Sequence, residues 1–174
     1  MAQIIDAYLG LMALRQAGYR STATAVAELV DNAIEAKAQN IDIIAISRAT
    51  FVSKRKSNQV EMIAVLDDGE GMSPEILANC LSLGWGTRLK TREGLGRFGF
   101  GLKGSSISQA RRVDVYSWIS AGEVYKARLD LDEIEQGKLT DLPAVEKSGF
   151  PVDIQNCFKE KIGETGTLVV WSDL

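Results

Sequence analysis

The strongest constraint on the fold of this chain is the segment Glu28-Leu-Val-Asp-Asn-Ala-Ile-Glu-Ala36. At about 100° per residue along a helix, its polar side chains fall within one arc of roughly 100°, while its aliphatic side chains fill the opposite arc. The polar residues are Glu28, Asp31, Asn32 and Glu35. The segment therefore predicts an amphipathic helix with its apolar side on a core and with three acids and an amide facing a cleft or solvent.

A second polar segment, Asp67-Asp-Gly-Glu-Gly-Met72, lies downstream of the first. It directly follows residues 60–66, a run that is apolar apart from Glu61 and is typical of a strand. That strand would deliver Asp67 at its end. Glycines at 69 and 71 then permit a tight turn.

The remaining patterns place helices early in the chain and most strands later. Helices are predicted over 3–16, from 21 or 22 to between 37 and 40, from 73 to about 83, and over 105–110. Strands are predicted over 41–46, 60–66, 113–119, 124–131 and 166–171, with a hairpin tip at 53–58 and a short helix or loop within 132–164. We expect an α+β sandwich, with helices on one face of a mixed, mostly antiparallel sheet, and a single domain over 1–174.

The composition excludes several classes of protein. The net charge of -3 gives no broad basic surface, so nucleic-acid binding is not supported. No apolar run approaches the length of a membrane span and the start of the chain does not resemble a secretory signal, so no membrane association and a cytoplasmic location are expected. Cys80 and Cys157 are far apart and are expected to be free thiols rather than a zinc site.

The chain contains no histidine. This excludes Ser-His and Cys-His nucleophile pairs, imidazole metal ligands and a histidine phosphoryl acceptor within the chain. Any general base here is a carboxylate or a lysine.

A glycine-rich segment runs from Gly94 to Gly104 and matches G-x-G-x-x-G over Gly94 to Gly99. No buried strand precedes it, as a dinucleotide fold requires. The kinase valine after the last glycine is missing, and Leu102 stands where a Walker loop needs lysine. The glycines, with Lys103 among them and a helix predicted beyond, are compatible with phosphate binding through backbone N–H groups, although the segment taken alone favours a flexible surface loop.

Four motifs in this order resemble the ATP site of the gyrase, heat-shock chaperone, histidine kinase and MutL (GHKL) superfamily. They are Glu28-x-x-x-Asn32, Asp67-x-Gly69-x-Gly71, the Gly96 to Gly104 loop and Thr165-Gly-Thr167. The resemblance spans residues 21–171 and implies the α/β sandwich called the Bergerat fold. The loop is most similar to the lid of microrchidia (MORC) ATPases, and residues 165–171 also resemble the closing strand of the gyrase B domain.

The resemblance implies roles at the catalytic end of the site. Glu28 would be the general base that activates water, Asn32 would give its amide oxygen to Mg²⁺, and Lys103 would contact the γ-phosphate. The glycine-rich lid would close on ATP or ADP. Its nucleotide-binding residues would be Gly96, Phe98, Gly99, Phe100, Gly101, Leu102 and Lys103.

At the base end, the resemblance implies that Asp67 accepts a hydrogen bond from the exocyclic amine of adenine. Gly69 and Gly71 would form the turn beneath the base, and Met72 would line the pocket. Thr167 would reach adenine directly or through water.

These roles predict Mg²⁺-dependent ATP binding and hydrolysis, coupled to conformational change and to a nucleotide-dependent homodimer. A histidine kinase catalytic domain is one alternative, although such kinases usually carry asparagine where Glu28 stands. A nucleotide-sensing module without turnover is the other, because the relatives take a catalytic lysine from a following domain and this sequence ends at Leu174. The chain is therefore expected to be the N-terminal part of a longer protein and to turn over slowly.

Overall fold

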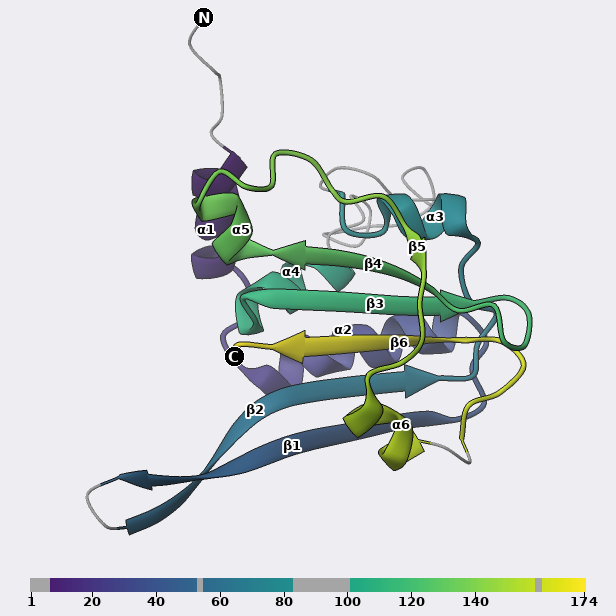
Figure 1. Ribbon diagram of the computed structural model, residues 1–174, viewed down its shortest axis with the longest axis horizontal. Coiled ribbons are helices and arrows are strands. Elements are labelled where there is room, and N and C mark those ends of the chain that lie inside the picture. Colours follow the sequence, from purple (N-terminus) through teal and green to yellow (C-terminus); the bar gives the residue numbers. More distant parts are fainter. Residues whose placement is uncertain (1–6, 53–54, 83–100, 159–160) are drawn as a thin grey trace, which may run out of the picture.

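The computed structural model describes residues 7–52, 55–82, 101–158 and 161–174. Its centre is a six-stranded sheet in the order β1-β2-β6-β3-β4-β5, in which every pairing is antiparallel (Figure 1). The strands are β1 (Ile41–Val52), β2 (Arg55–Asp67), β3 (Arg112–Trp118), β4 (Tyr125–Asp130), β5 (Glu146–Lys147) and β6 (Gly166–Ser172). The predicted α+β sandwich is confirmed.

Helices cover one face of this sheet, as predicted. They are α1 (Ala7–Ala17), α2 (Thr22–Glu35), α3 (Pro74–Asn79), α4 (Gly101–Gln109) and α5 (Leu131–Glu135), with α6 (Val152–Phe158) on the opposite face. None of the helices in the described ranges is long and apolar enough to cross a membrane.

Two hydrophobic cores lie on the two faces of the sheet. The larger joins Leu11, Leu29, Leu77 and Ile107 of the helices to alternate strand residues such as Val115. The smaller packs Ile154 and Phe158 of α6 against the other face. Residues 132–164, for which the sequence predicted only a short helix or loop, therefore supply the helix that closes the second face.

Local signals fixed the starts of two helices. Ser21 caps α2, its hydroxyl accepting a hydrogen bond from the backbone N–H of Thr24 at 3.2 Å. Ser73 caps α3 in the same way, with Pro74 in the first turn. Both starts are confirmed, whereas α2 ends earlier than predicted, at Glu35.

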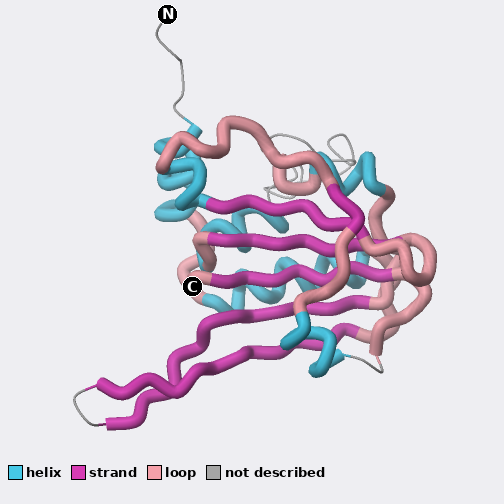
Figure 2. The backbone as a smooth tube through the Cα atoms, viewed as in Figure 1, coloured by secondary structure: helices cyan, strands magenta, loops and turns pink. Residues whose placement is uncertain are grey.

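α3 also ends earlier than predicted, at Asn79 instead of about 83, and the bounds of β1, β2 and α4 differ as well. β1 and β2 continue to Val52 and Arg55, so most of the predicted hairpin tip is strand, because paired backbones satisfy each other whatever the side chains (Figure 2). α4 begins at Gly101 instead of Ser105. Its far end is held by Arg15 of α1, whose Nη1 donates to the carbonyls of Ile107 and Ala110 at 2.7 Å each.

Candidate functional site

Helix α2 carries the first half of the site. Ala25, Leu29 and Ala33 are buried against the sheet, and Glu28 and Asn32 are half-buried one turn apart on another side of the helix. Asp31 and Glu35 are exposed. Of the four side chains in the predicted polar arc, two therefore lie against the fold and two face solvent.

The start of α4 lies against Glu28 and Asn32. A methyl group added at Gly101 would lie 2.9 Å from Oε2 of Glu28 and 3.9 Å from Nδ2 of Asn32. The first N–H groups of a helix have no intrahelical partner, and the helix dipole makes this end partially positive. The structure thus brings a carboxylate, an amide and a helix N-terminus together, a set suited to an anion that carries a metal ion.

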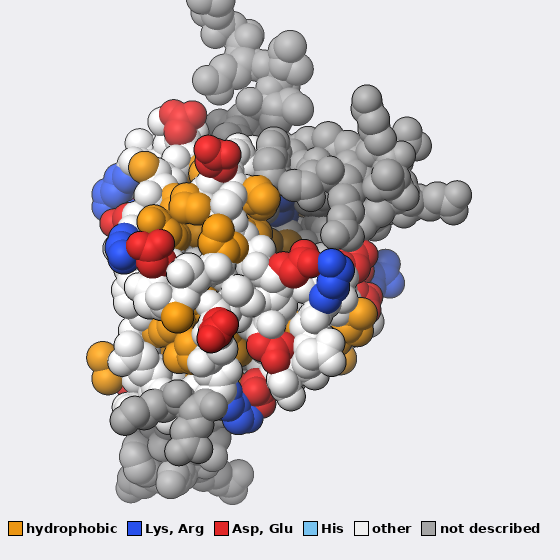
Figure 3. Space-filling model, turned by 90° about the vertical axis from the view of Figure 1, so that its right-hand side faces the viewer, with side chains coloured by type: hydrophobic (Ala, Val, Ile, Leu, Met, Phe, Trp, Pro, Cys, Tyr) orange, Lys and Arg blue, Asp and Glu red, His pale blue; other side chains and the backbone are white. Residues whose placement is uncertain are grey.

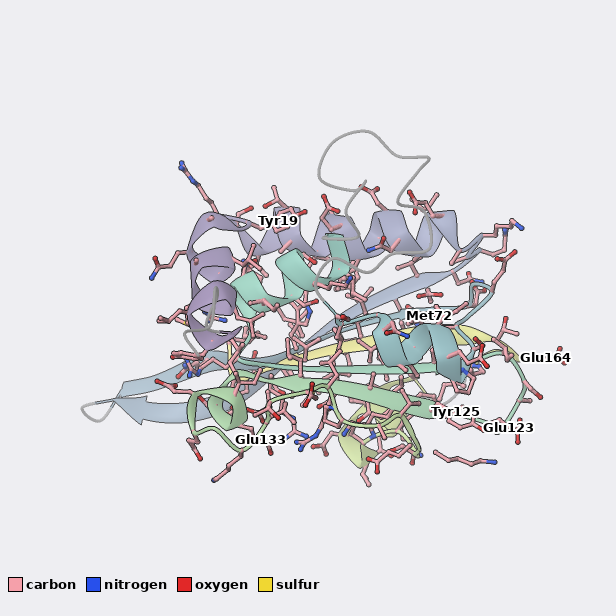
Figure 4. The ribbon with its side chains drawn as sticks, turned by 90° about the horizontal axis from the view of Figure 1, so that it is seen from above. Tyr19, Met72, Glu123, Tyr125, Glu133 and Glu164 are labelled. Atoms are coloured by element: carbon pink, nitrogen blue, oxygen red, sulfur yellow. The ribbon has the colours of Figure 1, made fainter. Side chains whose placement is uncertain are left out.

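Tyr19 lies close to the carboxylate of Glu28. Burial, with a smaller contribution from this carboxylate, raises the pKa of Tyr19 to about 12. Tyr19 lies at the junction of α1 and α2 (Figure 4). Sequence reasoning missed it, because no spacing rule links a residue ahead of a helix to a side chain two turns inside it.

Asn32 has an unsatisfied polar atom. Its Nδ2 is buried and has no hydrogen-bond partner in the described part of the chain. A 180° turn of the amide exchanges oxygen and nitrogen at little cost, so this position can present an oxygen. A neutral oxygen beside a helix N-terminus fits Mg²⁺, which takes oxygen ligands and commonly shares them with phosphate.

Asp67 ends β2 and is only 8 % exposed. One carboxylate oxygen accepts a hydrogen bond from the N–H of Gly69 at 2.9 Å. Burial raises the pKa of Asp67 to about 6; hydrogen bonds from the backbone of Gly69 and Thr167 oppose this rise, and the charge of Asp68 adds to it.

The turn after Asp67 is fastened to the end of α2. The N–H of Glu70 donates to the carbonyl of Ala36 at 2.9 Å, and the hydroxyl of Thr165 donates to the carbonyl of Gly69 at 2.7 Å. Gly71 has a φ of +69°, and a methyl group there would overlap the carbonyl of Trp118. Ala36 follows Asn32 by one turn, about 6 Å along the axis. The position of the Asp67 turn relative to Glu28 and Asn32 is therefore fixed.

Asp67, Thr167 and Ser117 stand side by side on three adjacent strands. Thr167 pairs with Asp67 in one direction and with Ser117 in the other. Met72, predicted to line the pocket, is half-buried ahead of α3 and donates its N–H to Oγ of Ser117 at 2.8 Å (Figure 4). Ser117 was not predicted as a site residue, because only strand pairing brings it beside Thr167.

Comparisons with known proteins identify the family of this chain. The family model for histidine kinase-, DNA gyrase B- and HSP90-like ATPases matches residues 19–164, which contain all of these features except Thr165 and Thr167. The chain belongs to this ATPase family. The resemblance noted in the sequence is confirmed.

Within the GHKL family, curated relatives are microrchidia proteins. Protein MICRORCHIDIA 4 of Arabidopsis thaliana is 34 % identical over 97 residues, covering 53 % of this chain and 11 % of the relative. MORC family CW-type zinc finger protein 1 of Homo sapiens is 38 % identical over 84 residues, covering 48 % of this chain and 8 % of the relative. The chain thus spans a small part of these relatives.

A solved structure supports the fold of this GHKL domain. The N-terminal domain of a DNA repair protein superposes with a TM-score of 0.57 at 20 % identity, covering 94 % of this chain and 39 % of that one. Because the identity is low, this likeness shows the Bergerat-type fold alone.

Lys103 lies on the first turn of α4 but is 2 % exposed. Burial lowers its pKa, and its charge acts on Cys80 at the end of α3, whose own pKa burial raises to about 12. Gly101 faces Glu28, while Lys103, two residues on, lies near α3. Its predicted contact with the γ-phosphate stays a prediction, and Leu102 packs against the larger core.

The remaining predicted lid residues, Gly96, Phe98, Gly99 and Phe100, lie outside the described residues. On the face in Figure 3, acidic and basic side chains of the described residues are interspersed rather than gathered into a basic patch. A cavity of about 420 Å³ at the ends of β1 and β2 includes Asp67 in its lining but neither Glu28 nor Asn32. The cavity therefore borders the Asp67 end of the candidate site and does not include the Glu28–Asn32 pair.

Proposed function

We propose that this GHKL domain binds ATP with Mg²⁺ and hydrolyses it to ADP and phosphate. One observation carries the proposal: Glu28 and Asn32 occupy successive turns of α2 beside the start of α4, and the Asp67 turn is fastened to the end of the same helix. A nucleotide lying along α2 would place its adenine at the Asp67 turn and its phosphates beside Glu28, Asn32 and the start of α4.

At the base end, the ionised carboxylate of Asp67 accepts a hydrogen bond from the adenine amine. One of its oxygens is already engaged by Gly69, which fixes the orientation of the carboxylate. Thr167 is its neighbour on β6, and Met72 lies at the end of the Gly71 turn. These residues bind and orient the base without taking part in the chemistry.

At the phosphate end, the free N–H groups of the first turn of α4 bind phosphate oxygens. The oxygen of Asn32 holds Mg²⁺, which when bound supplies positive charge that offsets the charge of the triphosphate. Asn32 suits this position because its neutral amide does not repel phosphate.

Glu28 acts as the general base. Its carboxylate takes a proton from water as the water oxygen bonds to the γ-phosphorus and the bond to the β,γ-bridging oxygen breaks, which leaves ADP and inorganic phosphate. Tyr19 lies beside this carboxylate, and the absence of a side chain at Gly101 leaves the room that the carboxylate occupies.

A second function, nucleotide sensing without turnover, is favoured by one observation. Lys103 is buried, and its charge acts on Cys80 at the end of α3. If no other cation neutralises the γ-phosphate, the domain holds ATP and releases phosphate slowly.

Steady-state phosphate release with Mg²⁺ tests the proposal. Glu28→Ala should reduce turnover by about 10² or more while ADP affinity stays within a few-fold of wild type. Asp31→Ala, which removes an exposed acid from the same helix, is the matched control and should retain full activity. Equal turnover in wild type and Glu28→Ala would refute the hydrolase assignment, and binding without release in wild type would establish the sensing module.

We also propose that ATP closes the lid and drives a homodimer. Sedimentation velocity with a non-hydrolysable ATP analogue should show a dimer that is absent with ADP. A monomer under both conditions would remove dimerisation from the proposed cycle. Transfer of labelled phosphate to a histidine-containing protein would instead favour the kinase alternative.

A further inference from the structure

Ser117 is a fully buried hydroxyl with three polar neighbours. Its exposed fraction is 0 %, and it lies on β3 behind the base-recognition end of the proposed site. Its Oγ is 2.8 Å from the N–H of Met72, 2.9 Å from the carbonyl of Gly166 and 3.0 Å from Oγ1 of Thr167. A serine hydroxyl has one proton and two lone pairs, so these three contacts use its full capacity.

The direction of each hydrogen bond follows from its partner. The backbone N–H of Met72 can only donate and the carbonyl of Gly166 can only accept, so the single proton of Ser117 goes to Gly166. One lone pair of Ser117 then remains, and the hydroxyl of Thr167 must donate to it. If Ser117 donated to Thr167 instead, the buried carbonyl of Gly166 would lose this donor, which is unfavourable.

This arrangement fixes the polarity of Thr167. Its hydroxyl proton is directed into the sheet, so its oxygen can only accept hydrogen bonds from other groups. Thr167 is the cross-strand neighbour of Asp67, whose ionised carboxylate is also only an acceptor. The two groups that face the base therefore offer acceptors and no donor.

We propose that Ser117 is a specificity-determining residue, which selects a 6-amino purine over a 6-oxo purine by holding the hydroxyl proton of Thr167. The inference rests on the proposed nucleotide site. Adenine presents an amine donor at position 6, whereas hypoxanthine presents an oxygen that would meet two acceptors. A mismatch of this kind leaves buried polar groups unpaired and is strongly disfavoured.

Calorimetric titration of ADP and inosine diphosphate with Mg²⁺ tests this role. Wild type should prefer ADP. In Ser117→Ala the hydroxyl of Thr167 is free to turn and donate to the 6-oxygen, so the ratio of the two affinities should fall about tenfold, equivalent to about one hydrogen bond. An unchanged ratio in a folded Ser117→Ala protein would overturn the inference.

Thr167→Val provides a second variant that does not depend on the folding of Ser117→Ala. It removes the acceptor through which Ser117 acts, so it should lower the ratio by itself, and adding Ser117→Ala should lower it no further. A wild-type ratio in Thr167→Val would overturn the inference.

Ser106→Ala is the matched control. It removes another fully buried serine hydroxyl, which accepts from Nε1 of Trp171 at 2.8 Å between α4 and β6. It should lower stability without changing the affinity ratio, and an equal change in ratio would show that Ser117 acts only through stability. If wild type bound neither nucleotide, the proposed function would fail; if wild type bound ADP with a ratio insensitive to Ser117 and Thr167, only this inference would fail.

Discussion

Asp67 and Asp68 are chemically identical neighbours that the fold places in opposite electrostatic situations. Asp67 is buried with one backbone donor, and burial raises its pKa to about 6. Asp68 accepts hydrogen bonds from the N–H groups of Gln39 and Asn40 at 2.7 and 2.8 Å and from the side chain of Asn40, which lower its pKa. The first is the residue that we propose to recognise adenine, whereas the second fastens the chain between α2 and β1.

This difference predicts opposite effects of pH on two variants. The raised pKa of Asp67 means that ionisation opposes folding, so its contribution to stability is present below about pH 4 and is lost as pH rises through 6. The free energy of unfolding of Asp67→Asn should therefore rise relative to that of wild type as pH rises, by about 2 to 3 kcal/mol at neutral pH. Urea unfolding at several pH values measures this difference.

Asp68→Asn serves as the control for that series. The lowered pKa of Asp68 means that its ionised form stabilises the fold. The free energy of unfolding of wild type should therefore rise relative to that of Asp68→Asn as pH rises, and this difference should be lost in acid. The same pH trend in both variants would contradict the assigned environments.

At the scale of elements, α4 is the part of the site that the sequence placed least well. Its first turn contains Gly101, Leu102, Lys103 and Gly104, a composition that favours a loop. Contacts with α1 and α2 favour a helix at these residues in the folded protein, and the two hydrogen bonds from Arg15 hold its far end. The N–H groups that we propose to bind phosphate at residues 101–104 thus lie in the first turn of a helix.

Two glycines on this turn allow a paired test. An added methyl group at Gly101 would lie 2.9 Å from Oε2 of Glu28, whereas at Gly104 it would meet only Tyr19, at an ordinary 3.8 Å. Gly101→Ala should displace the Glu28 carboxylate and lower turnover about tenfold or more, because general-base catalysis depends on position. Gly104→Ala should keep turnover within a few-fold.

Both alanines favour the helix, so neither variant should unfold more readily than wild type. Phosphate-release rates and thermal unfolding are measured on both proteins. Together they distinguish an effect of the position of Glu28 from an effect of lower stability. Equal activities of the two variants would show that the start of α4 does not govern Glu28.

At the scale of the whole molecule, the sheet separates two cores with different tasks. The larger core positions α2, α3 and α4 and therefore the candidate site, whereas the smaller core packs α6 against the opposite face of the sheet. Stability and nucleotide binding should consequently respond differently to changes in the two cores.

Phe158→Leu tests this separation. Phe158 is 1 % exposed in the smaller core, and the smaller side chain should lower the free energy of unfolding by about 1 to 2 kcal/mol. ADP affinity, measured by titration well below the unfolding temperature, should stay at the wild-type value. Val152→Ala, at a site 70 % exposed on the same helix, is the control and should change neither quantity. A weaker affinity in Phe158→Leu would show that the two faces are coupled.

The sequence by itself determined the elements that depend on local patterns: the amphipathic α2 with its Ser21 cap, the start of α3, and the strand that ends at Asp67. These follow from side-chain periodicity and capping, which act between residues a few positions apart. From the same motifs came the family and the roles predicted for Glu28, Asn32 and Asp67.

Only the tertiary structure decided what depends on contacts between distant segments. Tyr19 meets Glu28 across a helix junction, Ser117 meets Thr167 through strand pairing, and α4 begins at Gly101 where the helix packs against α1 and α2. Burial separated the roles of Asp67 and Asp68 and placed Lys103 near Cys80. Desolvation and long-range hydrogen bonds are set by the packed chain, and no local pattern in the sequence records them.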